Sequence, residues 1–210
     1  MKLFLRYKYS FGLLLLFTTM NTSVMGQNGK AVTEVKGLAV GSKVPQFTAT
    51  DADGKKYKLE KALKKGPVVL LFYRGQWCPV CNRHLSHLQD SLRFIYEKGA
   101  TVIAISPEKP ELLKKTKEKT KASFTLLHDK GFLIGNAFDV VFNPDIKQVG
   151  MYNERLHANL EGASSDGSSR LPVPATFIID KNGKIVWRQF NSDYRIRASV
   201  KDIIDNIPRS

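Results

Sequence analysis

The sequence predicts a one-domain α/β sandwich, in which helices cover a central sheet. Its 210 residues are enough for one domain with a sizeable core. Residues 67–73 (PVVLLFY) and 101–106 (TVIAIS) are short, continuous apolar runs, as expected of strands buried on both faces. A stretch with helical periodicity follows each run. Strands that alternate with helices in this way are typical of an α/β architecture.

The helix after the first buried strand is expected to begin at Pro79, because proline is favoured in the first turn of a helix. Its apolar stripe should consist of Leu85, Leu88, Leu92 and Ile95, and Gly99 should end it. A second, charged helix is expected over residues 109–121, directly after the second buried strand.

The other elements are shorter. Residues 44–59 should form two strands around an Asp-Gly turn, and residues 124–129 a third. Residues 175–180 and 184–190 should form a hairpin, and residues 196–206 a last helix. Residues 144–170 show little pattern beyond a short helical stretch before them, and EGASSDGSSR within them is expected to be a flexible loop.

The first 26 residues have the features of a secretory signal peptide. Lys2, Arg6 and Lys8 precede the apolar run FGLLLLF, and small and polar residues follow it as far as Gly26. That run is shorter than the roughly 20 residues of a membrane-spanning helix. We therefore expect cleavage and export, to a bacterial periplasm or outside the cell, with no stable membrane insertion afterwards. An uncleaved N-terminal anchor is the alternative.

The expected organisation is thus a signal peptide over residues 1–26, a flexible leader over 27–37 and a folded domain over 38–207. The formal net charge is +14. Much of it lies in PEKPELLKKTKEKTK (107–121), where acids are interspersed and no aromatic residues occur, so this stretch indicates a solvated helix face. A nucleic-acid groove would favour stacking aromatics and clustered arginines, so we expect no nucleic-acid partner.

The segment FYRGQWCPVC (72–81) holds both cysteines of the chain, Cys78 and Cys81. They stand where a buried strand gives way to a helix. There, the free N–H groups and the dipole of the helix stabilise an anion. A thiol in such a place has its pKa lowered below about 8.5 and becomes nucleophilic. The position therefore predicts a redox-active pair.

Three other uses of the pair are weaker. A structural disulfide would close a loop of four residues, worth only about 2 kcal/mol. A c-type haem link needs histidine after the second cysteine, where Asn82 stands. A zinc site built from the pair with His84 and His87 would place all its ligands on about one and a half helical turns, which cannot surround the ion tetrahedrally. We therefore expect no metal and no other cofactor.

The motif WCPVC after an apolar strand resembles the W-C-x-x-C of the thioredoxin superfamily. More closely, residues 38–207 resemble the peroxiredoxin family of alkyl hydroperoxide reductases and thiol-specific antioxidants. The matching pieces are GSKVPQFTATDADGKKYKL, VVLLFY, VIAISPEKPELLKK and PATFIIDKNGKIV, in the family's order. The resemblance implies a thioredoxin-like three-layer sandwich, whose central mixed sheet is flanked by helices.

The chain departs from the family pattern at its reactive centre. The pattern P-x-x-x-T-x-x-C, counted back from Cys81, has Arg74 at the proline and Cys78 at the threonine. Pro174 stands where the family has an arginine, and it resembles instead the cis-proline that packs against the cysteine pair in thioredoxins. Arg74 is the candidate to replace the missing arginine, unless it is simply a surface residue on a loop.

Two supporting roles complete the expected site. Gln76 is a candidate hydrogen-bond donor to the substrate, and Trp77 is expected to pack beside the thiols. In the peroxiredoxin pattern, Cys81 attacks a hydroperoxide and Cys78 then forms a redox disulfide with it, which a thioredoxin-like dithiol partner reduces. In the thioredoxin pattern, Cys78 attacks first and Cys81 resolves, which makes the protein a thiol-disulfide oxidoreductase. Both readings remain open at this point.

Overall fold

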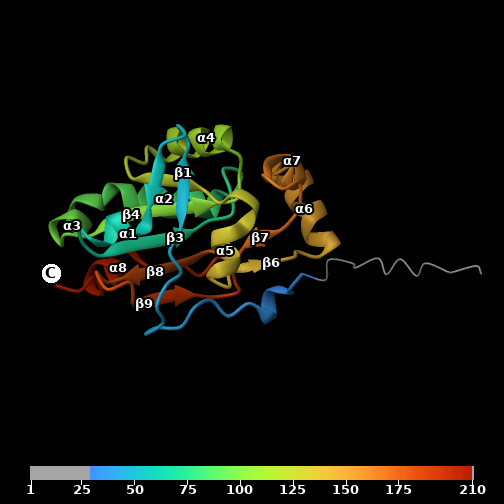
Figure 1. Cartoon of the computed structure of the whole chain (residues 1–210). Helices are drawn as coiled ribbons and strands as arrows, with labels where there is room; N and C mark the ends of the chain where they lie inside the picture. The colour runs from blue at the N-terminus through green and yellow to red at the C-terminus, as the bar shows by residue number, and fades with distance from the viewer. Residues whose placement is uncertain (1–28, 210) are drawn as a thin grey trace, which may run out of the picture.

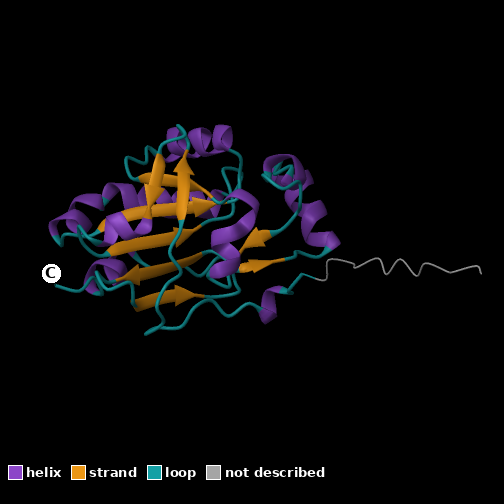
Figure 2. Cartoon of the chain, viewed as in Figure 1, coloured by secondary structure: helices purple, strands orange, loops and turns teal. Residues whose placement is uncertain are grey.

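The computed structural model describes residues 29–209, and the predicted signal peptide lies outside them. A seven-stranded mixed sheet runs through the domain in the order β2-β1-β5-β4-β3-β8-β9. Helices cover it to give three layers (Figures 1 and 2). The predicted α/β sandwich is confirmed. No helix among the described residues is long and apolar enough to cross a membrane.

The strand that leads to the cysteines is buried along its whole length. In β3 (Val68–Phe72) all five residues are buried. It pairs in parallel with β4 (Thr101–Ser106) and antiparallel with β8 (Ala175–Ile179). Because both of its edges are hydrogen-bonded, the point at which the chain leaves β3 is fixed.

The remaining strands extend the sheet outward. One end is completed by β5 (Thr125–His128), β1 (Thr48–Asp51) and β2 (Lys56–Lys58), and the other by β9 (Ile185–Phe190). A separate two-stranded sheet joins β6 (Val141–Phe142) to β7 (Leu171–Pro172).

Alternate residues of β3 face two different core clusters. Val69 and Leu71 pack with helices α2 (Pro79–Asp90), α3 (Leu92–Glu97), α4 (Pro110–Thr120) and α8 (Val200–Asp205). The other β3 residues pack with α1 (Leu59–Leu63) and α5 (Leu133–Ala137), which follows the 3-10 turn η2 (Lys130–Phe132). The cysteines belong to the first cluster.

The expected helix from Pro79 to Gly99 is interrupted. Ser91, with φ −106° and ψ 6°, ends α2 and begins α3. The predicted apolar stripe of Leu85, Leu88, Leu92 and Ile95 is nevertheless buried. All four residues belong to the same core cluster, so the stripe packs against one face of the sheet despite the break.

Residues 144–170, in which the sequence showed little pattern, contain two helices. These are α6 (Ile146–Leu156) and α7 (Leu160–Ala163). Asp145 caps α6: its carboxylate accepts a hydrogen bond from the Gln148 backbone N–H, and the Gln148 side chain accepts one from the Asp145 N–H. The segment expected to be flexible is tied by Asp166, which accepts hydrogen bonds from Ser164, Ser168 and Arg170.

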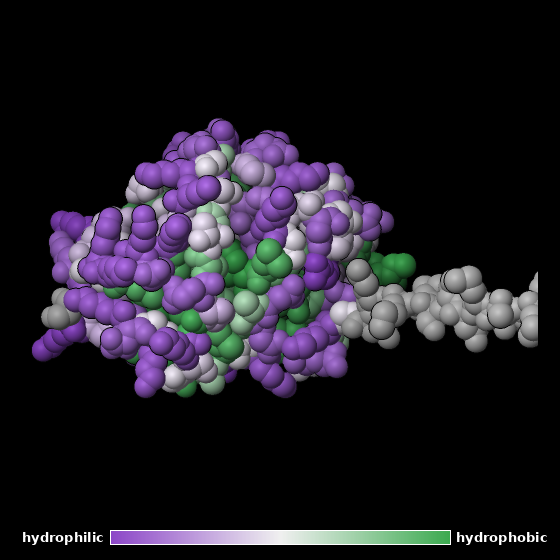
Figure 3. Space-filling view, in the orientation of Figure 1, coloured by the Kyte–Doolittle hydropathy of each residue, from purple (hydrophilic) through white to green (hydrophobic). Residues whose placement is uncertain are grey.

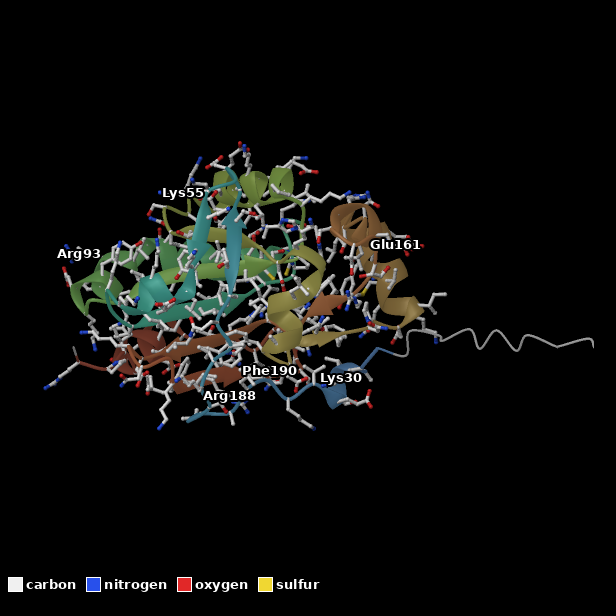
Figure 4. The ribbon with its side chains drawn as sticks, viewed as in Figure 1. Lys30, Lys55, Arg93, Glu161, Arg188 and Phe190 are labelled. Atoms are coloured by element: carbon white, nitrogen blue, oxygen red, sulfur yellow. The ribbon has the colours of Figure 1, made fainter. Side chains whose placement is uncertain are left out.

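Residues 29–37, expected to be part of a flexible leader, pack against the domain instead. They contain the short turn η1 (Val32–Glu34), and Val35 is buried. Lys30 pairs with Asp139, and Arg188 donates three hydrogen bonds to the carbonyls of residues 36–38 (Figure 4). Charge pairing and these backbone contacts, which composition does not reveal, hold the segment in place.

The bond before Pro174 is trans, since the described residues contain no cis peptide bond. The expectation drawn from thioredoxins is therefore wrong on this point. Leu171 and Pro172 pair with β6, and the Val173 N–H donates to the Val140 carbonyl at 2.7 Å. These contacts keep the chain extended into β8. Pro174 itself is buried.

The backbone at Gly66 lies very close to the backbone at Gly99, and this contact provides a test of stability. A Cβ at Gly66 would lie 2.0 Å from the Gly99 carbonyl oxygen, where the chain enters the parallel strands β3 and β4. Gly66→Ala should lower the free energy of unfolding by about 1–3 kcal/mol. Gly150→Ala, inside α6 and with nothing within 4 Å, is the matched control and should raise it by up to about 1 kcal/mol. Urea unfolding measures both, and equal effects would contradict the proposed clash.

Candidate active site

The cysteine pair lies at the start of α2, as the sequence predicts. Cys78 is the N-cap residue and Pro79 the first residue of the helix. The Cys78 Sγ accepts a hydrogen bond from the Cys81 backbone N–H at 3.2 Å. The sulfur thus occupies the place that serine or aspartate oxygen takes in most helix caps. Both cysteines are free thiols, 0% and 2% exposed.

Arg74 is part of this site and is not a surface residue. Its side chain is only 2% exposed, and its Nη2 lies 3.2 Å from the Cys78 Sγ. The guanidinium carbon lies 5.0 Å from the ring centroids of Trp77 and Tyr152 and 3.8 Å from that of Tyr194. These rings hold the cation by cation–π attraction. They therefore fix the guanidinium beside the sulfur.

A second arginine, Arg197, was not predicted. It lies in the loop between β9 and α8, and its Nη2 is 3.6 Å from the Cys81 Sγ. Each sulfur therefore has a guanidinium of its own. No sequence spacing indicates this contact, because 116 residues separate the two partners.

The two arginines favour one thiolate in the pair. Burial opposes the ionisation of Cys81, but a hydrogen bond from the Cys78 thiol and the charges of Arg197 and Arg74 lower its pKa to about 5. Burial and the neighbouring Cys81 sulfur raise the pKa of Cys78. The charge and the hydrogen bond of Arg74 lower the pKa of Cys78, but they do not outweigh those two effects. The two thiols therefore titrate as one unit that carries a single negative charge.

A buried carboxyl group, Glu108, lies under the same loop and was also not predicted. It is 2% exposed, and its Oε2 accepts a hydrogen bond from the Gln76 backbone N–H at 2.7 Å. Burial raises its pKa to about 8. A Cβ at Gly75 would lie 2.4 Å from its Oε1, so glycine is what lets the loop cross the carboxyl.

The other predicted site residues differ in their placement. Trp77 is buried and packs on Tyr152, with ring centroids 5.3 Å apart, as expected of a packing residue. The Gln76 side-chain oxygen accepts a hydrogen bond from Lys119 on α4. Pro174 is preceded by Val173, which belongs to the core cluster that contains both cysteines.

Three comparisons place this chain among known proteins. A sequence model of the AhpC/TSA family matches residues 40–188. A chloroplastic peroxiredoxin Q of Oryza sativa subsp. japonica is 30% identical over 167 residues, which are 78% of this chain and 66% of that protein. The thiol-disulfide oxidoreductase ResA of Geobacillus thermodenitrificans is 27% identical over 154 residues, 73% of this chain and 70% of that protein.

Among solved structures, the peroxidoxin BcpB of Mycobacterium tuberculosis superposes with a TM-score of 0.59 at 23% identity, over 75% of this chain and 91% of that one. The fold and the cysteine site define a peroxiredoxin-like protein of the thioredoxin superfamily. Within that class, the chain belongs to the AhpC/TSA family. It spans just under two thirds, 66%, of the rice peroxiredoxin Q.

The contact of Arg197 with Cys81 can be tested by titration. Arg197→Met removes a cation next to the sulfur, so the pKa of Cys81 should rise from about 5 by about one to three pH units. Arg74→Met should raise it as well. Thiolate absorbance against pH measures the change. Arg195→Met is the control, because Arg195 is exposed and pairs with Asp193. An unchanged titration in Arg197→Met would remove Arg197 from the site.

Proposed function

We propose that this protein is a thiol peroxidase that reduces hydrogen peroxide and alkyl hydroperoxides through its cysteine pair. The observation that carries the proposal is the buried Cys81 sulfur, whose pKa is lowered to about 5 in a site that holds two guanidiniums. A thiolate is the form that attacks peroxides, and fixed cations stabilise the charge that moves to the leaving oxygen.

In the first step, the Cys81 thiolate attacks one oxygen of the hydroperoxide. A sulfur–oxygen bond forms, the oxygen–oxygen bond breaks, and its electron pair leaves with the second oxygen as alkoxide or hydroxide. Cys81 becomes a sulfenic acid. The leaving oxygen takes a proton, and Glu108 is the buried acid that still holds one at neutral pH because its pKa is about 8.

In the second step, the Cys78 sulfur attacks the Cys81 sulfenic acid. A disulfide forms, the sulfur–oxygen bond breaks, and the hydroxyl group leaves as water with the proton of the Cys78 thiol. A thioredoxin-like dithiol partner then supplies two electrons by thiol–disulfide exchange. The spacing of the pair across the first turn of α2 supports this step, because Cys81 donates its backbone N–H to the Cys78 sulfur.

A second candidate function keeps the same site but changes the order of attack. Cys78 caps α2 and receives the Arg74 guanidinium at 3.2 Å, which are features of an attacking thiol. The likeness to a thiol-disulfide oxidoreductase supports the same reading. In this case Cys78 attacks a protein disulfide and Cys81 resolves the mixed disulfide.

We also propose export from the cytoplasm. The support is the charged, apolar and small-residue order of residues 1–26. An oxidising compartment would leave the pair as a disulfide unless a partner reduced it. Mass spectrometry of the protein purified from periplasmic and membrane fractions tests this, and a chain that keeps residues 1–26 would contradict cleavage.

The two functions are separated by trapping the sulfenic acid. Reduced wild type, Cys78→Ser and Cys81→Ser are each mixed with one equivalent of hydrogen peroxide and a sulfenic-acid probe. We expect a labelled Cys81 in Cys78→Ser, with peroxide loss far faster than with a free thiol, and no label in Cys81→Ser. Peroxide loss no faster than with free thiol in any variant, together with rapid reduction of insulin disulfides, would transfer the function to the second candidate.

The role of Glu108 predicts a pH profile with two limits. The peroxidase rate should rise as pH passes about 5, where Cys81 ionises, and fall as pH passes about 8, where Glu108 loses its proton. Glu108→Gln keeps an acceptor for the Gln76 N–H but has no proton to give. It should slow peroxide reduction by about 10²-fold or more and remove the upper limit.

Glu111→Gln, an exposed change on α4, is the control for Glu108→Gln and should keep both limits. Stopped-flow peroxide consumption between pH 4 and pH 10 makes the measurement. An upper limit that persists in Glu108→Gln would show that another group donates the proton.

A further inference from the structure

A basic pocket of about 320 Å³ lies far from the cysteine pair. Its lining includes residues 101–103, the first half of β4, and residue 125, the first of β5. The cysteines follow the opposite end of β3, which runs parallel to β4. Five residue steps along β4, at about 3.3 Å each, separate the two ends by about 17 Å. A ligand in this pocket would therefore not touch the reacting sulfurs.

The pocket is strongly positive. Four lysines line it, Lys56 and Lys58 on β2 and Lys61 and Lys65 on and just after α1, and no lining residue is acidic. Within residues 29–209, none of the four makes an ion pair, whereas the nearby Glu60 pairs with Lys64. Figure 3 shows hydrophilic residues crowded over the part of the surface where α1 lies. Mutual repulsion among these ammonium groups favours a bound anion.

Two hydroxyl groups of the lining residues lack partners. The Tyr57 Oη and the Thr101 Oγ1 are buried and have no hydrogen-bond partner in the described part of the chain. A buried hydroxyl without a partner costs about 1–3 kcal/mol. The aromatic rings of Tyr57, Tyr96 and Phe124 supply flat walls to the same pocket. The lining thus combines cations and rings with two unpartnered hydroxyls, which are covered in this structure and would reach a ligand only after a small side-chain movement.

Protection of the sheet edge explains only part of this arrangement. β2 is an edge strand, and lysines on an edge prevent pairing with other chains. That accounts for Lys56 and Lys58. It does not account for Lys61 and Lys65, which are outside the strand, nor for the unpartnered Tyr57 and Thr101 hydroxyls.

We propose that this pocket binds an organic phosphate that carries a planar ring, of the size of a nucleotide. A phosphate group offers two negative charges and several acceptor oxygens, which suit lysine point charges and hydroxyl donors. A planar ring suits the aromatic walls. The volume lies at the lower end of that of small-molecule sites.

Titration calorimetry at low salt tests the proposal with three probes: adenosine diphosphate, inorganic pyrophosphate and adenosine. We expect adenosine diphosphate to bind most tightly, with Kd below about 1 mM, pyrophosphate more weakly, and adenosine not measurably. Lys61→Glu should weaken binding of adenosine diphosphate by about tenfold or more, a loss of 1.4 kcal/mol or more. Tyr57→Phe, which keeps the ring and removes the hydroxyl, should weaken it by several-fold.

Lys64→Glu is the matched control, since Lys64 lies on the same helical segment, pairs with Glu60 and does not line the pocket. It should change Kd less than twofold, and peroxide consumption by Lys61→Glu should equal that of wild type. An equal loss in Lys61→Glu and Lys64→Glu would overturn the proposal. So would binding of anionic phospholipid vesicles without binding of adenosine diphosphate, or no binding of either phosphate probe.

Discussion

The contact between two buried sulfurs and two guanidiniums, that of the buried Arg74 and that of the half-buried Arg197, is the constraint on which the site depends. A charge removed from water is tolerated only when an opposite charge meets it. Arg74 and Arg197 are both buried or half-buried beside the pair, and neither has a carboxylate partner within 4 Å among the described residues. The thiolate is therefore the anion that compensates them. This reciprocal need couples the ionisation of the cysteines to the packing of the chain around them.

The fold meets this need by bringing three separate segments to one end of the sheet. β3 delivers Arg74 and the cysteines, and the neighbouring parallel strand β4 ends just before Glu108. The loop after β9 returns Arg197 and Tyr194 over them. Since β3 is hydrogen-bonded on both sides and buried along its length, the position of the helix start is not adjustable. The precise placement of the sulfurs therefore follows from a strand that is buried along its whole length.

Local pattern was enough to predict the elements that carry the pair, but not the groups that surround it. The apolar runs of β3 and β4, Pro79 and the stripe on α2 are contiguous signals. α6 was missed although both of its signals are present in the sequence: Asp145 and Gln148 form a capping box, and Val149, Tyr152 and Leu156 follow at helical spacing. Arg197 could not be predicted as a site residue, because only the tertiary fold brings it to Cys81. In the sequence, Glu108 looks like one of the charged residues of a solvated helix. Only the tertiary fold buries its carboxyl group beneath the loop whose Gln76 N–H donates to it.

Because both sulfurs are covered, the site suits a small substrate better than a large one. Both sulfurs are covered in the reduced form, and a small peroxide needs a much smaller opening than a protein disulfide, whose sulfur must come within about 2 Å of its attacker. Reduction of the disulfide needs a larger opening, because the dithiol partner is itself a protein. Disulfide formation removes the anion that Arg74 and Arg197 compensate, and it leaves one buried and one half-buried cation without a negative partner. Burial and the Arg74 charge already lower the pKa of Arg197. Oxidation therefore weakens the hold of the 191–199 loop at the moment when the proposed peroxidase cycle needs that loop to move.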